Sequence, residues 1–265
     1  MPGKKLPELY TDGGPSVDWF DLMPASPICD GDIAFYLRHV RKVGGPVLEL
    51  GAGTGRIALA IARSGFDVVG LDRSRHMVSR ARENAQAQAA ASARFLRGDM
   101  ARFDVRRRFG VIIIAFRSFQ HLLTSAAQRG CILCAHRHLR RGGRFILQLF
   151  DPRLDLCLPQ QEPTEMDRSE VVDPRTGRTL EVEVGGRRND PLTQTLEERW
   201  KWTERDASGS ITRESEDVLR LRWTYRQEMA YLLELAGFHV RACYSDFSGS
   251  PPRYGAEQVW VAEKP

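Results

Sequence analysis

The segment VLELGAGTGR, residues 47–56, places three glycines on alternate positions after a short apolar run. An alanine-rich helical pattern follows. A glycine-rich turn between a strand and a helix suits a nucleotide, because loop amides and the helix amino terminus favour negative groups. A triphosphate loop requires Lys and then Ser or Thr after the last glycine, and Arg56 and Ile57 stand there instead. The dinucleotide fingerprint fails as well, because Arg56 replaces its third glycine. The loop therefore serves another nucleotide-like ligand, or packing alone.

Two later carboxylates, each at the end of a predicted strand, point to an adenosine. Asp72 ends the apolar segment FDVVGLD, and a carboxylate at that position accepts both ribose hydroxyls. Asp99 ends ARFLRGD and precedes Met100. It can accept a hydrogen bond from an adenine amino group while Met77 or Met100 covers the ring. The alternative for Asp99 is a helix or turn cap.

Strand-like and helix-like segments alternate between residues 32 and 151 in a way that positions these groups at one edge of a sheet. A first helix is expected from Asp32 to about Arg41, with Asp30 or Asp32 as its cap. A later helix, SAAQRGCILCAHRHLRRGG, is expected to end at its paired glycines. Five strands alternating with helices predict right-handed crossovers and a parallel sheet. These strands are VLEL, FDVVGLD, ARFLRGD, FGVIIIAF and RFILQLF.

The pattern changes after residue 151. Period-two alternation predicts an antiparallel meander of about three strands inserted between residues 152 and 225. A helix, RQEMAYLLELAG, and two strands, FHVRACYSDF and EQVWVAEK, complete the chain. Residues 1–31 are expected to form an irregular arm, because they are rich in Pro, Gly and Asp.

Four features of the chain together resemble the class I S-adenosylmethionine-dependent methyltransferases. In chain order they are ELGAGTG, GLDRS with Met77 shortly after it, GDM, and a buried strand that runs into a polar-aromatic loop. The resemblance covers residues 32–151 and the terminal strand pair in 226–265. It implies an α/β fold, a doubly wound seven-stranded, mostly parallel sheet with an antiparallel last strand. Residues 152–225 would then be a small antiparallel β lid.

The resemblance also implies which residues bind the cofactor, S-adenosyl-L-methionine. Glu49, Gly51 and Gly53 would lie at its methionyl part, and Gly55 would allow the helix to begin close by. The acid after the second strand would lie at the ribose, the acid after the third strand and the methionines at the adenine, and the phenylalanine beside the sulfonium. These residues are Glu49, Gly51, Gly53, Gly55, Asp72, Met77, Asp99, Met100 and Phe116.

The loop FRSFQHLL, after the fourth strand, would face the methyl acceptor in such an enzyme. Its polar residues Arg117, Ser118 and Gln120, with Phe20 of the arm, are the candidate substrate-binding residues. His121 is the candidate general base, because a histidine titrates near neutral pH. The alternative for His121 is a cap or a packed side chain. Methyl transfer from a sulfonium needs mostly in-line positioning and desolvation, so a dedicated base need not exist.

The sequence favours a small-molecule acceptor, methylated at nitrogen or oxygen. The Asn/Asp-Pro-Pro-aromatic and Pro-Cys motifs of DNA methyltransferases are absent from the chain. A net charge of +5 invites nucleic acid, but the arginines are spread along the chain, and a solvated surface is the favoured interpretation. An RNA or protein methyltransferase, or a non-catalytic protein that binds the cofactor, are the alternatives. No apolar run is long enough for a membrane span and no signal-peptide core is evident, so we expect a cytoplasmic protein.

Three further patterns have structural alternatives. Cys131, Cys134 and His138 share one helical face, but a structural zinc site usually needs a second ligand pair, so we expect core packing and no metal. Without a secretory signal, the five cysteines are expected to be reduced thiols. The aromatic pairs of the insert are interpreted as its own hydrophobic face, with a lid lining or a homodimer contact as alternatives; Trp19 and Phe20 would close the pocket from the other side. These pairs are Trp200 with Trp202 and Trp223 with Tyr225.

Overall fold

A computed structural model describes residues 6–10, 13–23, 26–154, 158 and 167–265. The chain divides into two compact units. The larger unit comprises Ser26–Arg153 and Arg222–Pro265, and the smaller comprises Met1–Ala25 and Leu154–Leu221. Cys157 lies outside the described residues.

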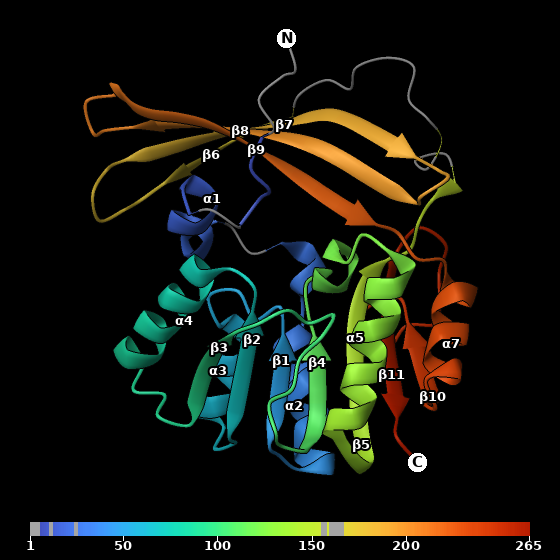
Figure 1. Ribbon diagram of the computed structural model, residues 1–265. Helices are drawn as coiled ribbons and strands as arrows, with labels where there is room; N and C mark the ends of the chain where they lie inside the picture. Colours follow the sequence, from blue (N-terminus) through green and yellow to red (C-terminus); the bar gives the residue numbers. More distant parts are fainter. Residues whose placement is uncertain (1–5, 11–12, 24–25, 155–157, 159–166) are drawn as a thin grey trace. The chain divides into compact units, whose positions relative to one another are not determined.

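The larger unit is built on a seven-stranded sheet (Figure 1). The strand order is β10-β11-β5-β4-β1-β2-β3, and neighbouring strands are parallel except where β11 pairs antiparallel with β5 and β10. This confirms the predicted α/β sheet with its antiparallel last strand. The strands are β1 (Val47–Leu50), β2 (Val68–Asp72), β3 (Ala93–Arg97), β4 (Phe109–Ile114), β5 (Leu139–Phe150), β10 (His239–Tyr244) and β11 (Glu257–Glu263).

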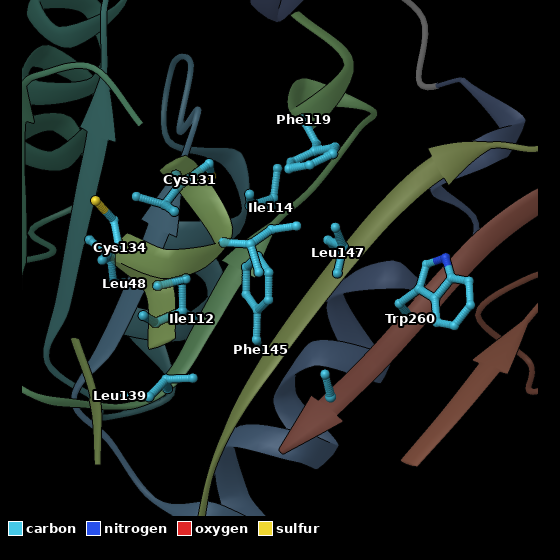
Figure 2. Packing of buried hydrophobic residues seen from close by; sticks show 14 of the residues in the cluster. Leu48, Ile112, Ile114, Phe119, Cys131, Cys134, Leu139, Phe145, Leu147 and Trp260 are labelled. Atoms are coloured by element: carbon cyan, nitrogen blue, oxygen red, sulfur yellow. The ribbon is translucent and has the colours of Figure 1, made fainter. Parts of the chain in front are cut away.

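Alternate residues of the central strands enter two different cores, which makes the sheet doubly wound. Ile112 and Ile114 of β4 belong to one core, and Val111 and Ile113 belong to the other. Figure 2 shows the first core, where Cys131 and Cys134 pack with Leu48 and Phe145. Its helices are α5 (Ser125–His138) and α7 (Arg226–Leu235), and those of the second core are α2 (Asp32–Val43), α3 (Arg56–Arg63) and α4 (Arg75–Ala87).

Several predicted boundaries are wrong because tertiary contacts override local signals. Helix α2 begins after Gly31, which makes no side-chain cap hydrogen bond, and Asp32 is buried and paired instead. Helix α5 ends at His138, and the following residues LRRGG already belong to β5, because Leu139 pairs with Phe109. Strand β4 ends at Ile114, so Phe116 lies in the turn after it. Strand β3 ends at Arg97, before Asp99.

The smaller unit contains a four-stranded antiparallel sheet, one strand more than expected. Its strands are β6 (Asp167–Val172), β7 (Thr179–Asp190), β8 (Thr195–Arg205) and β9 (Ile211–Arg222). Strand β6 shows no clear alternation, because Val171 is its single buried residue. Trp200 and Trp202 lie on one face of β8, with ring centroids 5.5 Å apart. The second aromatic pair is not on a strand: Trp223 follows β9, and Tyr225 is the N-cap of α7.

The segment before residue 31 contains short helices where an irregular arm was expected. They are α1 (Pro15–Asp18), η1 (Phe20–Leu22) and η2 (Pro27–Cys29). Trp19 is buried in the core of the smaller unit with Leu180 and Trp202. It therefore stabilises that sheet, contrary to the expectation that it closes the pocket. None of the helices in the described part of the chain is long and apolar enough to cross a membrane.

Candidate functional site

The glycine loop follows β1 at the carboxyl edge of the sheet. The amides of Gly51 and Ala52 donate to the carbonyl of Leu71, at 2.8 and 3.1 Å. Gly51 and Gly53 have φ values of 71° and 54°, a left-handed conformation that glycine adopts without a steric penalty. A Cβ on Gly51 would stand 2.7 Å from Cβ of Ser118, whereas a Cβ on Gly53 would meet nothing within 4 Å. The loop is therefore closed against Ser118 at Gly51 and open to a ligand at Gly53.

Gly55 has a packing role. Its φ is 93° at the start of α3, and a Cβ there would lie 2.7 Å from Cζ of Phe95. The absent side chain lets the helix begin close to the sheet, and contact of Gly55 with the cofactor stays a prediction.

Asp72 lies at the end of β2, directly beside the glycine loop. Its Oδ2 accepts from the Gly53 amide at 2.9 Å, and its Oδ1 accepts from the Ser74 amide at 2.8 Å. Burial raises the pKa of Asp72, while these amide bonds oppose the rise. A carboxylate offers about four acceptor sites. These amide bonds leave acceptor capacity on the carboxylate for the hydroxyls of a ribose.

Glu49 is a buried acid on β1, with 3% of its surface exposed. Its Oε2 accepts from the Ala58 amide of α3 at 2.8 Å. Burial raises the pKa of Glu49 to about 8, against the lowering effects of that amide and of Arg56. Glu49 thus carries a proton at neutral pH unless a cation approaches it. It joins β1 to the first turn of α3, below the glycine loop.

Arg56, the residue that excluded the phosphate-binding motifs, is neutralised by Asp32 of α2. Its two terminal nitrogens bond to the two carboxylate oxygens, Nη1 to Oδ1 at 3.0 Å. Asp32 is buried, with 2% of its side chain exposed. This two-pronged pair fixes α2 against the start of α3, and it uses the charge of Arg56 within the fold.

The turn after β4 holds two consecutive residues in the left-handed region. Phe116 and Arg117 have φ values of 50° and 60°, and each such non-glycine residue costs roughly 1–3 kcal/mol. The Phe116 amide donates to Oε1 of Gln148 at 3.0 Å. Arg117 pairs with Glu257, its Nε lying 3.3 Å from Oε2, and its guanidinium lies over the ring of Phe150.

Gln148 and Glu257 also bond to each other, with Nε2 of Gln148 3.0 Å from Oε2 of Glu257. Sequence reasoning missed both residues. The available signals were a glutamine inside the apolar strand RFILQLF and an acid at the start of EQVWV. Together they hold the turn in a conformation that leaves Phe116 39% exposed.

The remaining cofactor candidates differ in their accessibility. Met77 is 2% exposed, in the first turn of α4. Met100 is partly buried, and its Cε lies 3.8 Å from the point where a Cβ on Gly51 would stand. Asp99 is exposed, and its Oδ1 accepts from the Ala101 amide at 2.9 Å. That bond is the turn-stabilising alternative, and contact with the adenine stays a prediction for these three residues.

The acceptor candidates are also placed differently from one another. Oγ of Ser118 lies 3.4 Å from the Gly51 carbonyl, so this residue adjoins the glycine loop. Gln120 is fully buried: its Oε1 accepts from the Phe150 amide at 3.0 Å, and its amide nitrogen has no hydrogen-bond partner among the described residues. His121 ends η3 (Ser118–His121) and is half-buried. Phe20 belongs to the smaller unit, where its ring contacts Tyr10. Their roles toward a substrate stay predictions.

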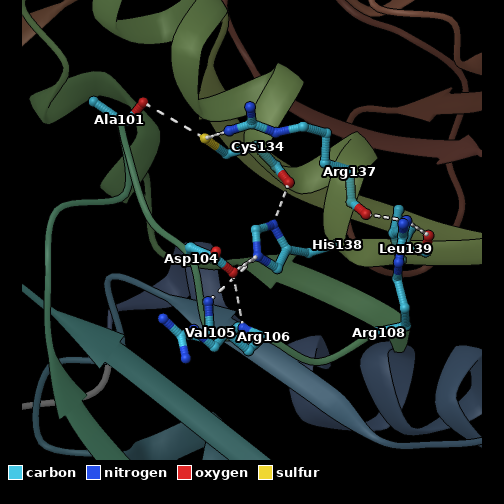
Figure 3. A network of polar contacts seen from close by, with 9 residues as sticks. All are labelled: Ala101, Asp104, Val105, Arg106, Arg108, Cys134, Arg137, His138 and Leu139. Carbon is cyan, nitrogen blue, oxygen red and sulfur yellow. Dashed lines mark hydrogen bonds and ion pairs between the residues drawn. The ribbon is translucent and has the colours of Figure 1, made fainter.

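The cysteine–histidine pattern of α5 serves packing. Cys131 and Cys134 lie in the hydrophobic core, and His138 bonds to the Cys134 carbonyl at 2.8 Å and to Asp104 at 3.2 Å (Figure 3). The described residues include no group of three His, Cys, Asp or Glu side chains that could hold a metal ion.

Comparisons with known proteins agree with this geometry. A methyltransferase domain family matches residues 47–143. The CcbJ methyltransferase of Streptomyces caelestis has a similar structure, with a TM-score of 0.75 and 28% identity over 97% of this chain and 98% of that one. A methyltransferase of Geobacillus sp. (strain WCH70) is 24% identical over 251 residues, which is 93% of this chain and 96% of that protein. A glycine/sarcosine N-methyltransferase of Parasynechococcus marenigrum is 30% identical over 138 residues, 49% of this chain and 45% of that protein.

The doubly wound sheet, with its glycine loop after β1 and its acid after β2, defines the class I methyltransferase fold. The chain carries a methyltransferase domain and has the fold of the S-adenosylmethionine-dependent methyltransferases, the family whose cofactor is S-adenosylmethionine. The site fits that cofactor, because the space at Gly53 is open and the Asp72 carboxylate beside it is oriented by two amides with acceptor capacity left.

Proposed function

We propose that the protein methylates an amine nitrogen of a small molecule. The observation that carries this proposal is the pairing of the arginines at the cofactor edge. Arg56 is held by Asp32 and Arg117 by Glu257, so neither guanidinium is free for the phosphates of a nucleic acid. The apolar ring of Phe116 is left as the exposed group of the turn. This surface suits a small, largely apolar acceptor better than an RNA strand.

The preference for nitrogen over oxygen rests on proton chemistry. A neutral amine is already a nucleophile, whereas an aliphatic hydroxyl must lose its proton to a strong base during attack. Within the turn 115–121, His121 is the candidate base, because histidine is the side chain whose ordinary pKa lies near neutrality. A histidine removes a proton from an ammonium far more readily than from an alcohol. The partial similarity to a glycine/sarcosine N-methyltransferase is consistent with an amine acceptor.

Under this proposal the cofactor, when bound, supplies an electrophilic methyl group on its sulfonium. Asp72 binds the ribose and fixes the direction of the cofactor, because its carboxylate is already oriented by two amides. Phe116 excludes water from the acceptor side. His121 receives the proton that the amine loses. The predicted role of residues 152–225 as a lid, and of Phe20 in the acceptor site, belongs to this proposal as well.

The test is release of S-adenosylhomocysteine with paired acceptors. Primary and secondary amines are compared with the alcohols of the same carbon skeleton, a mixed RNA and an unstructured peptide. Turnover with small amines alone supports the proposal. Turnover confined to RNA or peptide would refute it in favour of a macromolecular acceptor. A protein that is stabilised by the cofactor but shows no turnover with any acceptor of the panel would favour the non-catalytic alternative.

A further inference from the structure

A cavity lies at the amino end of β4, within the larger unit. Its volume is about 510 Å³. Most of the side chains that line it are basic, and they come from the segment before β4 and from the last turn of α5. The lining residues are Phe103, Asp104, Arg106, Arg107, Arg108, Arg137 and His138. We refer to this cavity as the arginine pocket.

The arginine pocket is separate from the cofactor loop. Strands β1 and β4 are parallel neighbours, with Val47 opposite Val111. The glycine loop follows the carboxyl end of β1, whereas the arginine pocket precedes Phe109, the first residue of β4. Strand β4, with 6 residues, spans roughly 20 Å at about 3.3 Å per residue. A ligand in the arginine pocket and the cofactor therefore occupy opposite edges of the sheet.

The charges of the arginine pocket do not balance. Arg107 pairs with Asp67 at 2.9 Å, and the carboxylate of Asp104 accepts from the Arg106 amide at 2.9 Å and contacts His138. Four guanidiniums thus face two carboxylates, an excess of two positive charges (4 − 2 = 2). This contrasts with Arg56 and Arg117 at the cofactor edge, each of which has its own carboxylate.

Stabilisation of the α5 carboxyl terminus explains only part of this charge. Basic side chains near a helix carboxyl terminus bond to its last carbonyls and complement its dipole. Arg108 does this by bonding to the carbonyls of Arg137 and Leu139 (Figure 3). Lys264 does it by bonding to the His136 carbonyl at 2.8 Å. Arg137 also lies in the last turn of α5, so the dipole favours its charge too, and Arg106 is left without this explanation.

Arg106 and Arg137 have no carboxylate of their own in the part of the chain that the structure describes. The guanidinium of Arg137 contacts Sγ of Cys134 at 2.9 Å. Arg106 has a φ of 48°, a left-handed conformation that non-glycine residues adopt uncommonly. Two arginines that form no ion pair with a carboxylate and that line one cavity are the arrangement expected of a binding site for an anion.

We propose that the arginine pocket binds a small ligand that carries two or more phosphate groups. The planar guanidinium binds phosphate oxygens through two parallel hydrogen bonds. The excess of two positive charges requires a multiply charged anion, and the volume falls within the range of about 300–1,000 Å³ that small-ligand sites occupy. The phosphates belong either to a free polyphosphate or to a nucleoside polyphosphate, because both present the same groups to the arginines.

The test is isothermal titration of the full-length protein with inorganic tripolyphosphate and with ATP. We expect saturable binding with one site per chain, which weakens as salt is added. The double variant R106Q/R137Q should bind tripolyphosphate at least tenfold more weakly. The matched control is R94Q, which removes one positive charge from an exposed residue of β3 and should leave binding unchanged. Thermal stabilisation by S-adenosylmethionine, retained in both variants, shows that they are folded.

The outcomes separate the sources of the phosphate and the alternatives. Tighter binding of ATP than of tripolyphosphate supports a nucleoside polyphosphate, and equal binding supports a free polyphosphate. If neither tripolyphosphate nor ATP binds saturably, the proposal is overturned. Binding that R106Q/R137Q retains overturns it too, because the arginine pocket is then not the site. Binding of a mixed RNA without binding of tripolyphosphate also overturns it, in favour of a nucleic-acid surface.

Discussion

Replacing Glu49 by glutamine should make the folded protein less sensitive to alkaline pH. Glu49 is 3% exposed, and burial raises its pKa from 4.5 to about 8. The folded state therefore holds this proton more tightly than the unfolded state does. Its contribution to the free energy of unfolding is fully present below pH 4.5 and is lost as the pH rises to about 8. A glutamine keeps the size of the side chain and has no proton to lose.

The size of the effect follows from linkage. One unit of pKa shift corresponds to about 1.4 kcal/mol, so between about pH 6 and about pH 8 the titration of Glu49 should remove roughly 2 kcal/mol from the free energy of unfolding. The hydrogen bond from the Ala58 amide to Oε2 opposes this rise in the pKa of Glu49, and the pKa of about 8 already includes its effect. A glutamine oxygen can still accept that bond, so E49Q should keep the link between β1 and α3.

The assay is urea denaturation without cofactor, followed by far-UV circular dichroism at the two pH values. The signal reports the larger unit, because helices α2, α3, α4, α5 and α7 all belong to it. The matched control is E234Q, on the exposed face of α7, which should show the same dependence on pH as the wild type. If E49Q loses as much stability between the two pH values as the wild type does, Glu49 is not the buried acid described above.

Three further predictions concern the cofactor and the acceptor. D72A should weaken S-adenosylmethionine binding at least tenfold in a thermal-shift titration, because two hydrogen bonds to a charged group are lost. G51A should lower the melting temperature, because a Cβ there would approach Ser118 at 2.7 Å, whereas G53A should cost roughly 1 kcal/mol of backbone strain and mainly weaken cofactor binding, because the space above it is open. H121A should reduce turnover roughly 10²–10⁴-fold with little change in cofactor affinity.

The controls for these variants lie on the same unit. D67A removes an exposed acid and should leave cofactor affinity unchanged, so a similar loss in D67A and D72A would point to a general charge effect. Equal destabilisation by G51A and G53A would contradict the difference in space above the two glycines. Loss of cofactor binding in H121A would contradict the role proposed for His121.

Most of the larger unit could be predicted from its sequence because its signals are local and consistent. Strand β4 reads as a continuous apolar run, and alternate residues of that run enter the two cores. The failures occur where a distant contact decides the conformation. The paired glycines in LRRGG signal a helix end, yet Leu139 has already joined the sheet opposite Phe109. Strand β6 was missed because a largely exposed edge strand carries little hydrophobic pattern.

The same distinction between local signals and distant contacts holds for the residues of the site. The glycine loop and Asp72 could be placed from the sequence because each lies at the end of an apolar strand in a motif of fixed spacing. Gln120 could not, because a turn of η3 directs it into the interior, where it bonds to Phe150. Gln148 and Glu257 were missed because a single polar residue in an apolar strand does not show which backbone group it bonds.

The conformation of the acceptor-side turn is therefore determined by residues far from it in the sequence. Phe116 and Arg117 adopt backbone angles that their side chains disfavour. The angles persist because Gln148 of β5 accepts from one amide, while Glu257 of β11 pairs with the neighbouring guanidinium and bonds to Gln148. The two strands pair antiparallel, and Glu257 stands opposite Phe150 at the edge where the parallel strands end. An antiparallel last strand thus places its first residue at the carboxyl edge of the sheet. A parallel strand would place its last residue there. In this protein the reversed strand supplies the carboxylate that neutralises Arg117, and this neutralisation is the feature that favours a small acceptor over a nucleic acid.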